Sequence, residues 1–441
     1  MIDKFKGFLF GKKEAEVILT AKDDVSGIAR FKYQYQSNTI SLSSKGQDET
    51  EVKFDSSDKN WKKNEDGTVS YTFKIKPQFR GNVSFKAIDN AGNVSTQIED
   101  RENTVVVDDT KPEVNISYQA VNGAELKATV EKDTDEKITR NNVDQIDENT
   151  RFIYDGTVEA TIEVKEANFF EDDAKITLTR DGKEIYSGSV TKAKSEKGSY
   201  SISEWKTAGQ DTVSCEITFE KDGDYQLKMD YSDSSDNEMS YTSDEYENKE
   251  GTKEYTSNII TVDTVKPQVK VTYDNNSAKN GNYYKNNRTA TICVTERNFR
   301  PSEVDFSAIS KNVQGKNVTY QYSDLKDWGD WKLVNKNTST WEAEVPFNVD
   351  ARYDVSFKYT DLAGHNLEKD FADAFIVDKE APNLNDMKIS YSTHIKTWQK
   401  VLHAITFGYY SYKEEVEVTL TAKDDISGID YLTWTYKQEA N

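Results

Sequence analysis

The chain is poor in the residues that build disulfide frameworks and histidine-based sites. Its 441 residues include only two cysteines, Cys215 and Cys293, and three histidines, His365, His394 and His403. The cysteines belong to different repeats of the chain, so no disulfide within a repeat is available. No histidine pair has metal-ligand spacing, and no nucleophile–base–acid triad can be assembled from these residues. The sequence therefore favours a non-enzymatic protein.

Long hydrophobic runs are also missing. No stretch approaches the ~20 apolar residues that cross a bilayer, and the opening residues 1–6 lead into no apolar core of a signal peptide. There is no glycine-rich phosphate loop of the Walker or dinucleotide type. We therefore expect neither membrane insertion of this segment nor nucleotide chemistry.

Basic residues are fewer than acidic ones. Asp and Glu total 78 against 57 Lys and Arg, a net charge of -21 with a sequence pI near 4.8. Such a surface repels nucleic acid and anionic membranes, so neither is an expected partner. It suits an extracellular protein or one that binds divalent cations.

Aromatic residues, in contrast, are plentiful. The chain has 25 Tyr and 19 Phe but only 4 Met. Aromatic and β-branched side chains fit a pleated, half-buried surface, so this composition favours strands over helices. At 441 residues the chain is too long for one core, and about three to four domains are expected.

One short motif occurs three times and divides the chain. The pattern Val-Asp-x-x-x-Pro is found at 107–112, 262–267 and 377–382. A repeat of this kind is typical of strings of modules rather than of a single catalytic domain. It predicts four modules, which are 1–110, 111–265, 266–380 and 381–441.

The modules align with one another at further positions. Each of the first three has a Trp-Lys pair and a strand that ends in an Asp turn, and all four have an alternating strand that ends in an acidic residue. The alternating strands are those before Asp23, Glu166, Glu296 and Asp424; the pairs begin at Trp61, Trp205 and Trp331; the turns begin at Asp89, Asp233 and Asp361. Period-2 alternation with regular turn signals predicts six or seven short strands per module, closed into a two-sheet antiparallel sandwich.

These motifs resemble bacterial immunoglobulin-like repeats. The resemblance is carried by the string "VTLTAKDDISGI" at 418–429, the Trp-Lys pairs, "DNAGN" at 89–93 and the Val-Asp-x-x-x-Pro motif, and it covers essentially the whole chain. It implies an all-β fold of tandem immunoglobulin-like β-sandwich modules in an elongated array. Such repeats occur in large Gram-positive surface adhesins and as accessory modules on secreted glycoside hydrolases and peptidases.

The resemblance also sets the functional expectation. It implies an extracellular, cell-surface or secreted, non-enzymatic segment of an adhesin that acts as a monomeric rod and binds a host glycoprotein, glycan or immunoglobulin. The alternative is a set of accessory or spacer modules of a large secreted glycoside hydrolase or peptidase. A repeat fold supports many activities, so the sequence does not choose between these.

The two ends of the chain carry near copies of one segment. Residues 13–36 and 414–437 match, with "AKDDVSGI" at 21–28 and "AKDDISGI" at 422–429. We expect the first module to lack its first strand and the last to stop after about its third, as in a slice of a longer array. An incomplete sandwich exposes strand edges, so the last module is expected to be the least stable.

Acidic residues from three places in each module are predicted to meet at the module junctions. In an immunoglobulin-like sandwich, the linker and two loops lie at the same pole. The predicted groups are Asp108, Glu166 and Asp233; Asp263, Glu296 and Asp361; and the partial set Asp378 and Asp424. Carboxylates from three loops suit Ca²⁺, which takes six to eight oxygens. The alternative is that each acid caps its own turn by accepting backbone N–H bonds.

Insertions are the places where a repeat scaffold can carry recognition. The second module has extra segments near 120–150 and around Tyr241 and Tyr246, and those two tyrosines and Trp328 are candidate ligand contacts. The last module has apolar residues at helical spacing near 393–404, which predicts a short helix. The Trp-Lys tryptophans are predicted to be core residues, Cys215 a buried inert thiol, and Cys293 a more accessible one.

Overall fold

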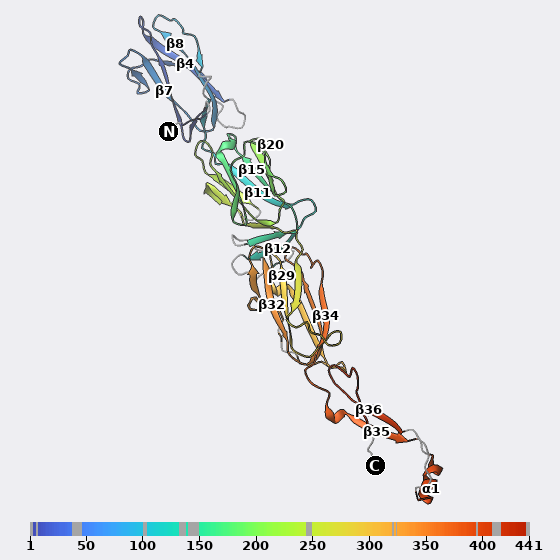
Figure 1. Cartoon of the computed structure of the whole chain (residues 1–441). Helices are drawn as coiled ribbons and strands as arrows, with labels where there is room; N and C mark the ends of the chain where they lie inside the picture. The colour runs from blue at the N-terminus through green and yellow to red at the C-terminus, as the bar shows by residue number, and fades with distance from the viewer. Residues whose placement is uncertain are drawn as a thin grey trace. The chain divides into compact units, whose positions relative to one another are not determined.

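The computed structural model divides into two compact units, Met1–Thr264 and Val265–Asn441 (Figure 1). It describes residues 3–5, 8–37, 46–99, 104–131, 138–139, 150–243, 249–319, 322, 324–393, 396–407 and 416–437. The division between the units falls within one residue of the predicted module boundary at 265. The predicted boundaries at 110 and 380 lie inside units and stay predictions.

The first unit begins with a sandwich of two sheets. One sheet has the order β1-β2-β10-β8-β4-β5, with β9 paired to β8, and the other has the order β3-β7-β6. Leu19, Phe31 and Trp61 from the two sheets share one buried cluster. The bounds are β1 Asp3–Phe5, β2 Phe8–Gly11, β3 Ala15–Ala21, β4 Ile28–Ser37, β5 Gly46–Lys53, β6 Trp61–Lys63, β7 Val69–Ile75, β8 Phe79–Asp89, β9 Ile98–Glu99 and β10 Thr104–Val107.

A larger sandwich completes the first unit. Its sheets have the orders β18-β19-β21-β15-β11-β23-β24, with β20 on β21, and β13-β12-β14-β26-β22-β16-β17, with β25 on β22. The bounds are β11 Glu113–Ala120, β12 Leu126–Glu131, β13 Ile138–Thr139, β14 Thr150–Tyr154, β15 Val158–Lys165, the 3-10 turn η1 Glu171–Asp173, β16 Ala174–Arg180, β17 Lys183–Ser189, β18 Lys194–Glu196, β19 Tyr200–Ile202, β20 Lys206–Gly209, β21 Thr212–Phe219, β22 Gly223–Tyr231, β23 Met239–Ser243, β24 Lys249–Thr252, β25 Glu254–Thr256 and β26 Ile259–Val262.

The second unit contains a smaller sandwich. Its four-stranded sheets have the orders β27-β29-β32-β31 and β28-β34-β33-β30. The bounds are β27 Gln268–Tyr273, β28 Tyr283–Tyr284, β29 Arg288–Thr295, η2 Pro301–Glu303, β30 Val304–Lys311, η3 Trp328–Asp330, β31 Lys332–Asn335, β32 Thr340–Phe347, β33 Ala351–Tyr359 and β34 Phe371–Val377. The alternating burial along β29 and β33 follows the period-2 pattern of their sequences, with one face on the core.

The rest of the second unit is sparsely paired. It contains η4 Leu384–Asp386, the two-stranded sheet of β35 Lys388–Thr393 and β36 Val416–Thr421, and the helix α1 Thr397–Ile405. The predicted short helix is thus confirmed, although His394 lies outside the described residues. In the described part of the chain, no helix is long and apolar enough to span a membrane.

The all-β fold of tandem sandwiches is confirmed, and the predicted core positions lie inside it. Trp61 and Trp331 are buried, and Trp205 is half-buried against the core of its sandwich. Cys215 is fully buried and Cys293 is partly exposed. Burial raises the pKa of each thiol to about 11, with Glu342 adding to the effect at Cys293, so both are weak nucleophiles near neutral pH.

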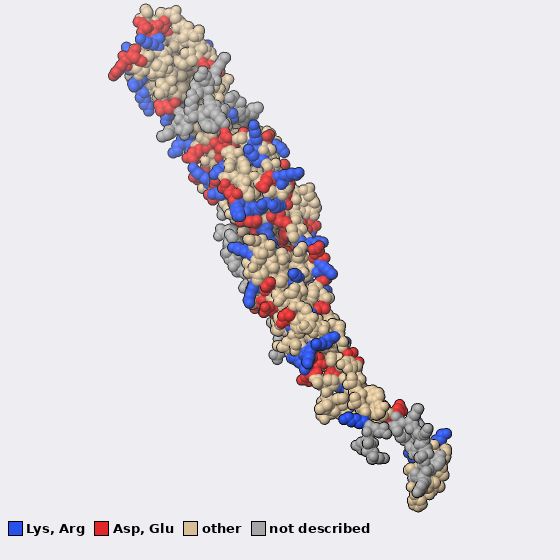
Figure 2. Space-filling model, in the orientation of Figure 1, with Lys and Arg blue, Asp and Glu red and all other residues tan. Residues whose placement is uncertain are grey.

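The surface mixes charges of both signs. On the face drawn in Figure 2, Lys and Arg are interspersed with Asp and Glu. Several pairs lie across neighbouring strands, such as Lys165 with Glu113 at 2.9 Å and Lys228 with Glu254 at 3.0 Å. These exposed pairs contribute little to stability individually.

We predict that Trp331→Ala destabilises the second unit by about 3–5 kcal/mol, because it leaves a cavity beside Phe299 and removes the indole N–H bond to the Leu325 carbonyl. The measurement is pulsed thiol labelling of Cys293 in a urea series, since this cysteine lies on β29 in the same sandwich. Trp328→Ala, at an exposed position, is the control and should change the midpoint little. Equal midpoint shifts for the two variants would show that Trp331 is not a core residue.

Candidate metal centre

The first acid of the candidate site ends the strand that leads out of the first sandwich. Val106 and Val107 of β10 are fully buried, and Asp108 follows them with 1% of its surface exposed. Its backbone N–H donates to the Gly11 carbonyl at 3.0 Å, which continues the pairing of β10 with β2. The Oδ1 atom of Asp108 accepts the N–H of Thr110 at 2.9 Å. The linker is therefore held in place before it enters the second sandwich.

The second acid follows β15. The alternating buried residues of this strand end at Val164, and Glu166 is also buried. Its backbone N–H donates to the Asp211 carbonyl at 2.7 Å, and its Oε1 accepts the N–H of Asn168 at 2.7 Å. The turn after the strand thus fixes the carboxylate at the end of the sheet.

The third acid sits in the Asp turn after β22. Asp233 Oδ1 accepts the N–H groups of Ser235 and Asn237 at 2.9 and 2.7 Å, and Oδ2 accepts the Asn237 amide at 2.8 Å. The first module repeats the arrangement with Asp89 and Asn93, where the two bonds are 2.7 and 2.8 Å. The motif therefore builds the same rigid turn wherever it occurs.

The structure brings these three acids together. One carboxylate oxygen from each of Asp108, Glu166 and Asp233 lies within 4.8 Å of the other two, and all three residues are buried. Two asparagines connect the linker to the loops. Asn168 Nδ2 donates to Asp108 Oδ2 at 2.5 Å, and Asn237 Nδ2 donates to the Asp108 carbonyl at 2.9 Å. The first junction thus has the convergence that its sequence predicts.

Burial and mutual repulsion perturb the ionisation of this cluster. Burial, reinforced by the nearby charge of Asp108, raises the pKa of Glu166 to about 8. Burial also raises the pKa of Asp233 to about 6, against hydrogen bonds from Asn237 that favour the carboxylate. Among the described residues no ion pair neutralises the cluster. Arg80 donates to the Asn168 amide oxygen at 3.4 Å.

A buried hydroxyl also lies beside the cluster. Tyr231, the last residue of β22, is 2% exposed, and its hydroxyl has no hydrogen-bond partner among the described residues. Burial raises the pKa of this hydroxyl well above its usual range, and the charges of Glu166 and Asp233 raise it further. A buried polar atom without a partner is costly unless an ion or water completes its surroundings.

The donor chemistry fits a hard divalent cation. Asp108, Glu166 and Asp233 are oxygen ligands from three separate segments, and Ca²⁺ accepts such sets with flexible geometry. The capping role that competes with this interpretation is also present, because each acid accepts at least one backbone N–H bond. Capping explains the turns but does not explain why three carboxylates are buried against one another without a counter-charge.

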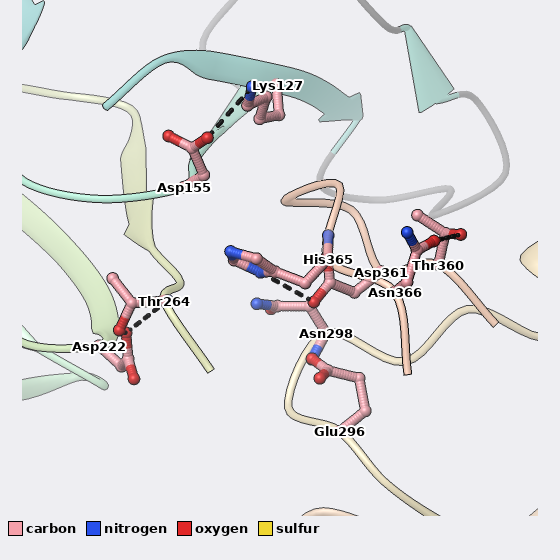
Figure 3. A network of polar contacts seen from close by, with 10 residues as sticks. All are labelled: Lys127, Asp155, Asp222, Thr264, Glu296, Asn298, Thr360, Asp361, His365 and Asn366. Carbon is pink, nitrogen blue, oxygen red and sulfur yellow. Dashed lines mark hydrogen bonds and ion pairs between the residues drawn. The ribbon is translucent and has the colours of Figure 1, made fainter. Parts of the chain in front are cut away.

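The second predicted group is divided between the units. Asp263 belongs to the first unit, where its N–H donates to the Tyr154 carbonyl at 3.0 Å, whereas Glu296 and Asp361 belong to the second. In the second unit, Asp361 is fully buried, and its Oδ1 accepts the backbone N–H of His365 at 2.7 Å. Its Oδ2 lies 3.2 Å from Nδ1 of the His365 ring, as Figure 3 shows. The joint metal role of these three acids stays a prediction.

The third group is a pair rather than a trio. Asp378 Oδ2 and Asp424 Oδ1 both accept the N–H of Ser427, at 3.1 and 2.8 Å. Burial raises the pKa of Asp378, and the charge of Asp424 adds to this effect. Both residues are partly exposed, and no third acid joins them within the described ranges.

The three candidate ligand-contact residues differ in where they lie in the structure. Tyr241 was expected in an exposed insertion, but it lies on β23, is 5% exposed and packs on Tyr255 at 5.1 Å. The prediction is wrong for Tyr241, because the segment pairs with β11 as an inner strand instead of looping out. Tyr246 lies outside the described residues. Trp328 is 39% exposed and rests against Trp341 at 5.1 Å.

Sequence reasoning missed the residues that support the acids. Asn168 and Asn237 tie Asp108 to its two neighbours, and Tyr231 approaches the cluster. A signal was present, since Asn298 and Tyr359 occupy the same places relative to Glu296 and Asp361 in the next module. Their roles depend on side-chain packing between segments, which strand periodicity does not report.

Comparisons with known proteins find no sequence match and a weak structural similarity. No known protein family and no curated protein matches the sequence. Among solved structures, the chain is similar to the fibronectin(III)-like modules of Clostridium thermocellum CbhA, with 16% identity and a TM-score of 0.17, over 52% of this chain and 88% of that one. A similarity this low carries no argument about function.

We predict that the free energy of unfolding of the first unit falls, in chelator, as the pH rises from about 4.5 to about 8. Over that range the folded state keeps protons on Glu166 and Asp233 that the unfolded chain has already released, so raising the pH favours unfolding. The total effect is on the order of a few kcal/mol. The measurement is labelling of Cys215, on β21 of this sandwich, in urea at a series of pH values.

Glu166→Gln removes one of the two titrating groups and should flatten this pH dependence. Glu163→Gln, on the strand β15 that precedes Glu166 but outside the cluster, is the control and should retain it. If the free energy of unfolding of Glu166→Gln fell with pH as steeply as that of the unaltered chain, Glu166 would not be one of the titrating groups.

Proposed function

We propose that this chain is a non-enzymatic, calcium-stabilised array of immunoglobulin-like modules from an extracellular bacterial protein, either attached to the cell surface or secreted. The observation that carries the proposal is the buried trio of Asp108, Glu166 and Asp233 at the junction of two sandwiches. One acid comes from the linker and two from loops of the following sandwich. A cation held by all three would lock the linker against that sandwich.

A cation would replace the protons that Glu166 and Asp233 otherwise keep in the folded state. Three buried carboxylates repel one another, and removing water from them costs several kcal/mol per charge. A divalent cation offsets both terms, and the loop and linker backbone could supply further oxygens. When bound, it would contribute charge neutralisation and a fixed linker rather than any chemical step.

The chain's composition supports an extracellular location. Sites with few charged ligands bind calcium weakly, with dissociation constants of about 10⁻⁴–10⁻³ M in extracellular modules. The net charge of -21 and the two unpaired cysteines in separate sandwiches fit a secreted protein that does not depend on disulfides. Partners of such an array are host or environmental proteins or glycans.

We predict that millimolar calcium stabilises the first unit by about 1–2 kcal/mol relative to chelator, because the ion binds the folded state only. The measurement is again the urea midpoint for labelling of Cys215. Glu166→Gln and Asp108→Asn should abolish the calcium effect on this probe, since each removes one charged ligand.

Asp89→Asn is the matched control for this experiment. Asp89 forms the same capped turn as Asp233 but lies outside the trio. It should lower stability through loss of the cap, yet leave the calcium effect on Cys215 intact. A calcium effect that survives in Glu166→Gln would refute the site, and the absence of any effect in the unaltered chain would refute the calcium role.

We propose that ligand recognition by the second unit uses Trp328. This side chain is exposed on η3 and is supported from behind by Trp341 and Phe299, at 5.1 and 6.3 Å. A rigid, exposed indole offers an apolar face on which a sugar ring can stack, with a polar edge beside it. The expected ligand class is therefore a glycan.

We predict that Trp328→Ala lowers glycan binding by tenfold or more on an array of bacterial and host glycans, while the urea midpoint for Cys293 changes little. Leu333→Ala, at a similarly exposed apolar position on β31, is the control and should bind as the unaltered chain does. Binding that is unchanged in Trp328→Ala, or absent in the unaltered chain, would remove Trp328 from the ligand surface.

A further inference from the structure

The strand β23 gives the second sandwich a partner that the third sandwich lacks. A pull on the two ends of the chain enters each of these sandwiches at the strand that follows the linker proline, which we call the entry strand. The entry strand of the second sandwich is β11, and it lies between β15 and β23. The entry strand of the third sandwich is β27, an edge strand that pairs with β29. The two entry strands are therefore held differently.

The difference begins after a backbone bond that both sandwiches share. The N–H of Ser240 donates to the Pro112 carbonyl at 2.8 Å, and the N–H of Glu368 donates to the Pro267 carbonyl at 3.2 Å. From this bond, β23 continues in parallel along residues 113–116 of β11. In the described part of the third sandwich, no strand follows Glu368 along β27, and the chain passes on to β34. Strand β23 therefore adds a second ladder of hydrogen bonds to the entry strand.

Side chains anchor β23 in the core of the second sandwich. Met239 is fully buried, and the ring of Tyr241 packs on that of Tyr255 with centroids 5.1 Å apart. Tyr255 belongs to β25, which pairs with β22 and leads into β26, the strand by which the chain leaves this sandwich. The hydroxyl of Tyr118 on β11 shares a hydrogen bond with that of Tyr255 at 2.8 Å. Strand β23 thus connects the entry strand with the strands that lead out.

The chain enters and leaves the second sandwich at opposite ends of its strands. It enters at Asp108, beside Glu166 at the end of β15, and it leaves at Asp263, whose N–H donates to the Tyr154 carbonyl just before β15 begins. A pull on these two points acts along the strands, so it strains the bonds of β11 to β15 and to β23 together. Bonds that share a load resist more force than bonds that break one after another.

We propose that β23 is a mechanical latch, which keeps the second sandwich folded under a tension that unfolds the third. The proposal gives the insertion around Tyr241 a load-bearing role in place of the ligand contact that its sequence suggests. Forced unfolding is governed by the unfolding rate, so the second ladder on β11 acts by slowing the detachment of this strand. The latch consists of backbone pairing and buried rings and requires no calcium, so it is independent of the metal site.

Pulling the full chain by handles at its two termini, in chelator, tests the order of unfolding. The second sandwich, residues 111–264, releases roughly 530 Å of extended chain and the third, residues 265–380, roughly 400 Å, so their steps differ in length. The step of the third sandwich is identified as the one that Trp331→Ala moves to lower force. In the unaltered chain this step should precede that of the second sandwich.

Thr242→Pro tests the latch itself. The N–H of Ser240 points at β11, so the alternation of a parallel ladder points the N–H of Thr242 at β11 as well, and proline removes this donor. The second sandwich of this variant should unfold about five- to tenfold faster at a given force, which is the effect of one lost hydrogen bond. Thr242→Val keeps the N–H and should unfold as the unaltered chain does.

Leu178→Ala separates a mechanical role from a general loss of stability. Leu178 is fully buried on β16, which is neither an entry strand nor a strand by which the chain leaves. The variant should lower the urea midpoint for Cys215 more than Thr242→Pro does, because it leaves a cavity in the core. It should nevertheless accelerate forced unfolding less, because β16 stays packed while β11 detaches.

Three results would overturn the proposal. The first is an unaltered chain whose second sandwich unfolds before the third. The second is Thr242→Pro that unfolds under force no faster than Thr242→Val. The third is Leu178→Ala that accelerates forced unfolding more than Thr242→Pro does. Failure of the calcium site would alter none of these outcomes, since every trace is recorded in chelator.

Discussion

Mutual repulsion among three buried carboxylates governs the junction inside the first unit. Asp108, Glu166 and Asp233 converge although nothing among the described residues neutralises them, and each is held there by backbone N–H groups of its own turn. The acids could move apart only by breaking these hydrogen bonds. Either protons or a cation must therefore resolve the repulsion, and the two alternatives give opposite dependence of stability on pH.

This constraint links folding of the linker to folding of the sandwich that follows it. Asn168 and Asn237 belong to loops of the second sandwich, yet both donate to Asp108 at the end of β10. The ring of Phe10 in β2 also packs on Phe170, with centroids 5.6 Å apart. The two sandwiches thus share an apolar contact beside the polar contacts of the linker, and a bound cation would act on contacts that already exist.

The predictable part of the fold came from periodicity and repetition. Strands such as β15 and β29 alternate between buried and half-exposed residues, and the sequence carries that alternation directly. The acid trio was predictable for a related reason, because three motifs at equivalent places in a sandwich must meet at one pole. The Asp turn needed no tertiary information, since Asp233 and its partner Asn237 lie within one turn.

The parts that escaped prediction depend on contacts between distant segments. The acidic residues that follow Tyr241 in the sequence are typical of an exposed loop. However, β23 pairs in parallel with β11, which lies more than a hundred residues earlier, and the Tyr241 ring is buried. Similarly, nothing local marks Asn168 as a donor to Asp108. The second junction stays a prediction, because Asp263 belongs to one unit and Asp361 to the other.

The most direct test of the central claim is an anomalous difference map from crystals of the full chain grown with calcium. We predict a peak among the carboxylates of Asp108, Glu166 and Asp233, with the oxygens drawn in toward it. A map without such a peak, with the carboxyl groups sharing protons at hydrogen-bonding distance, would contradict it and leave the three acids as caps of their own turns.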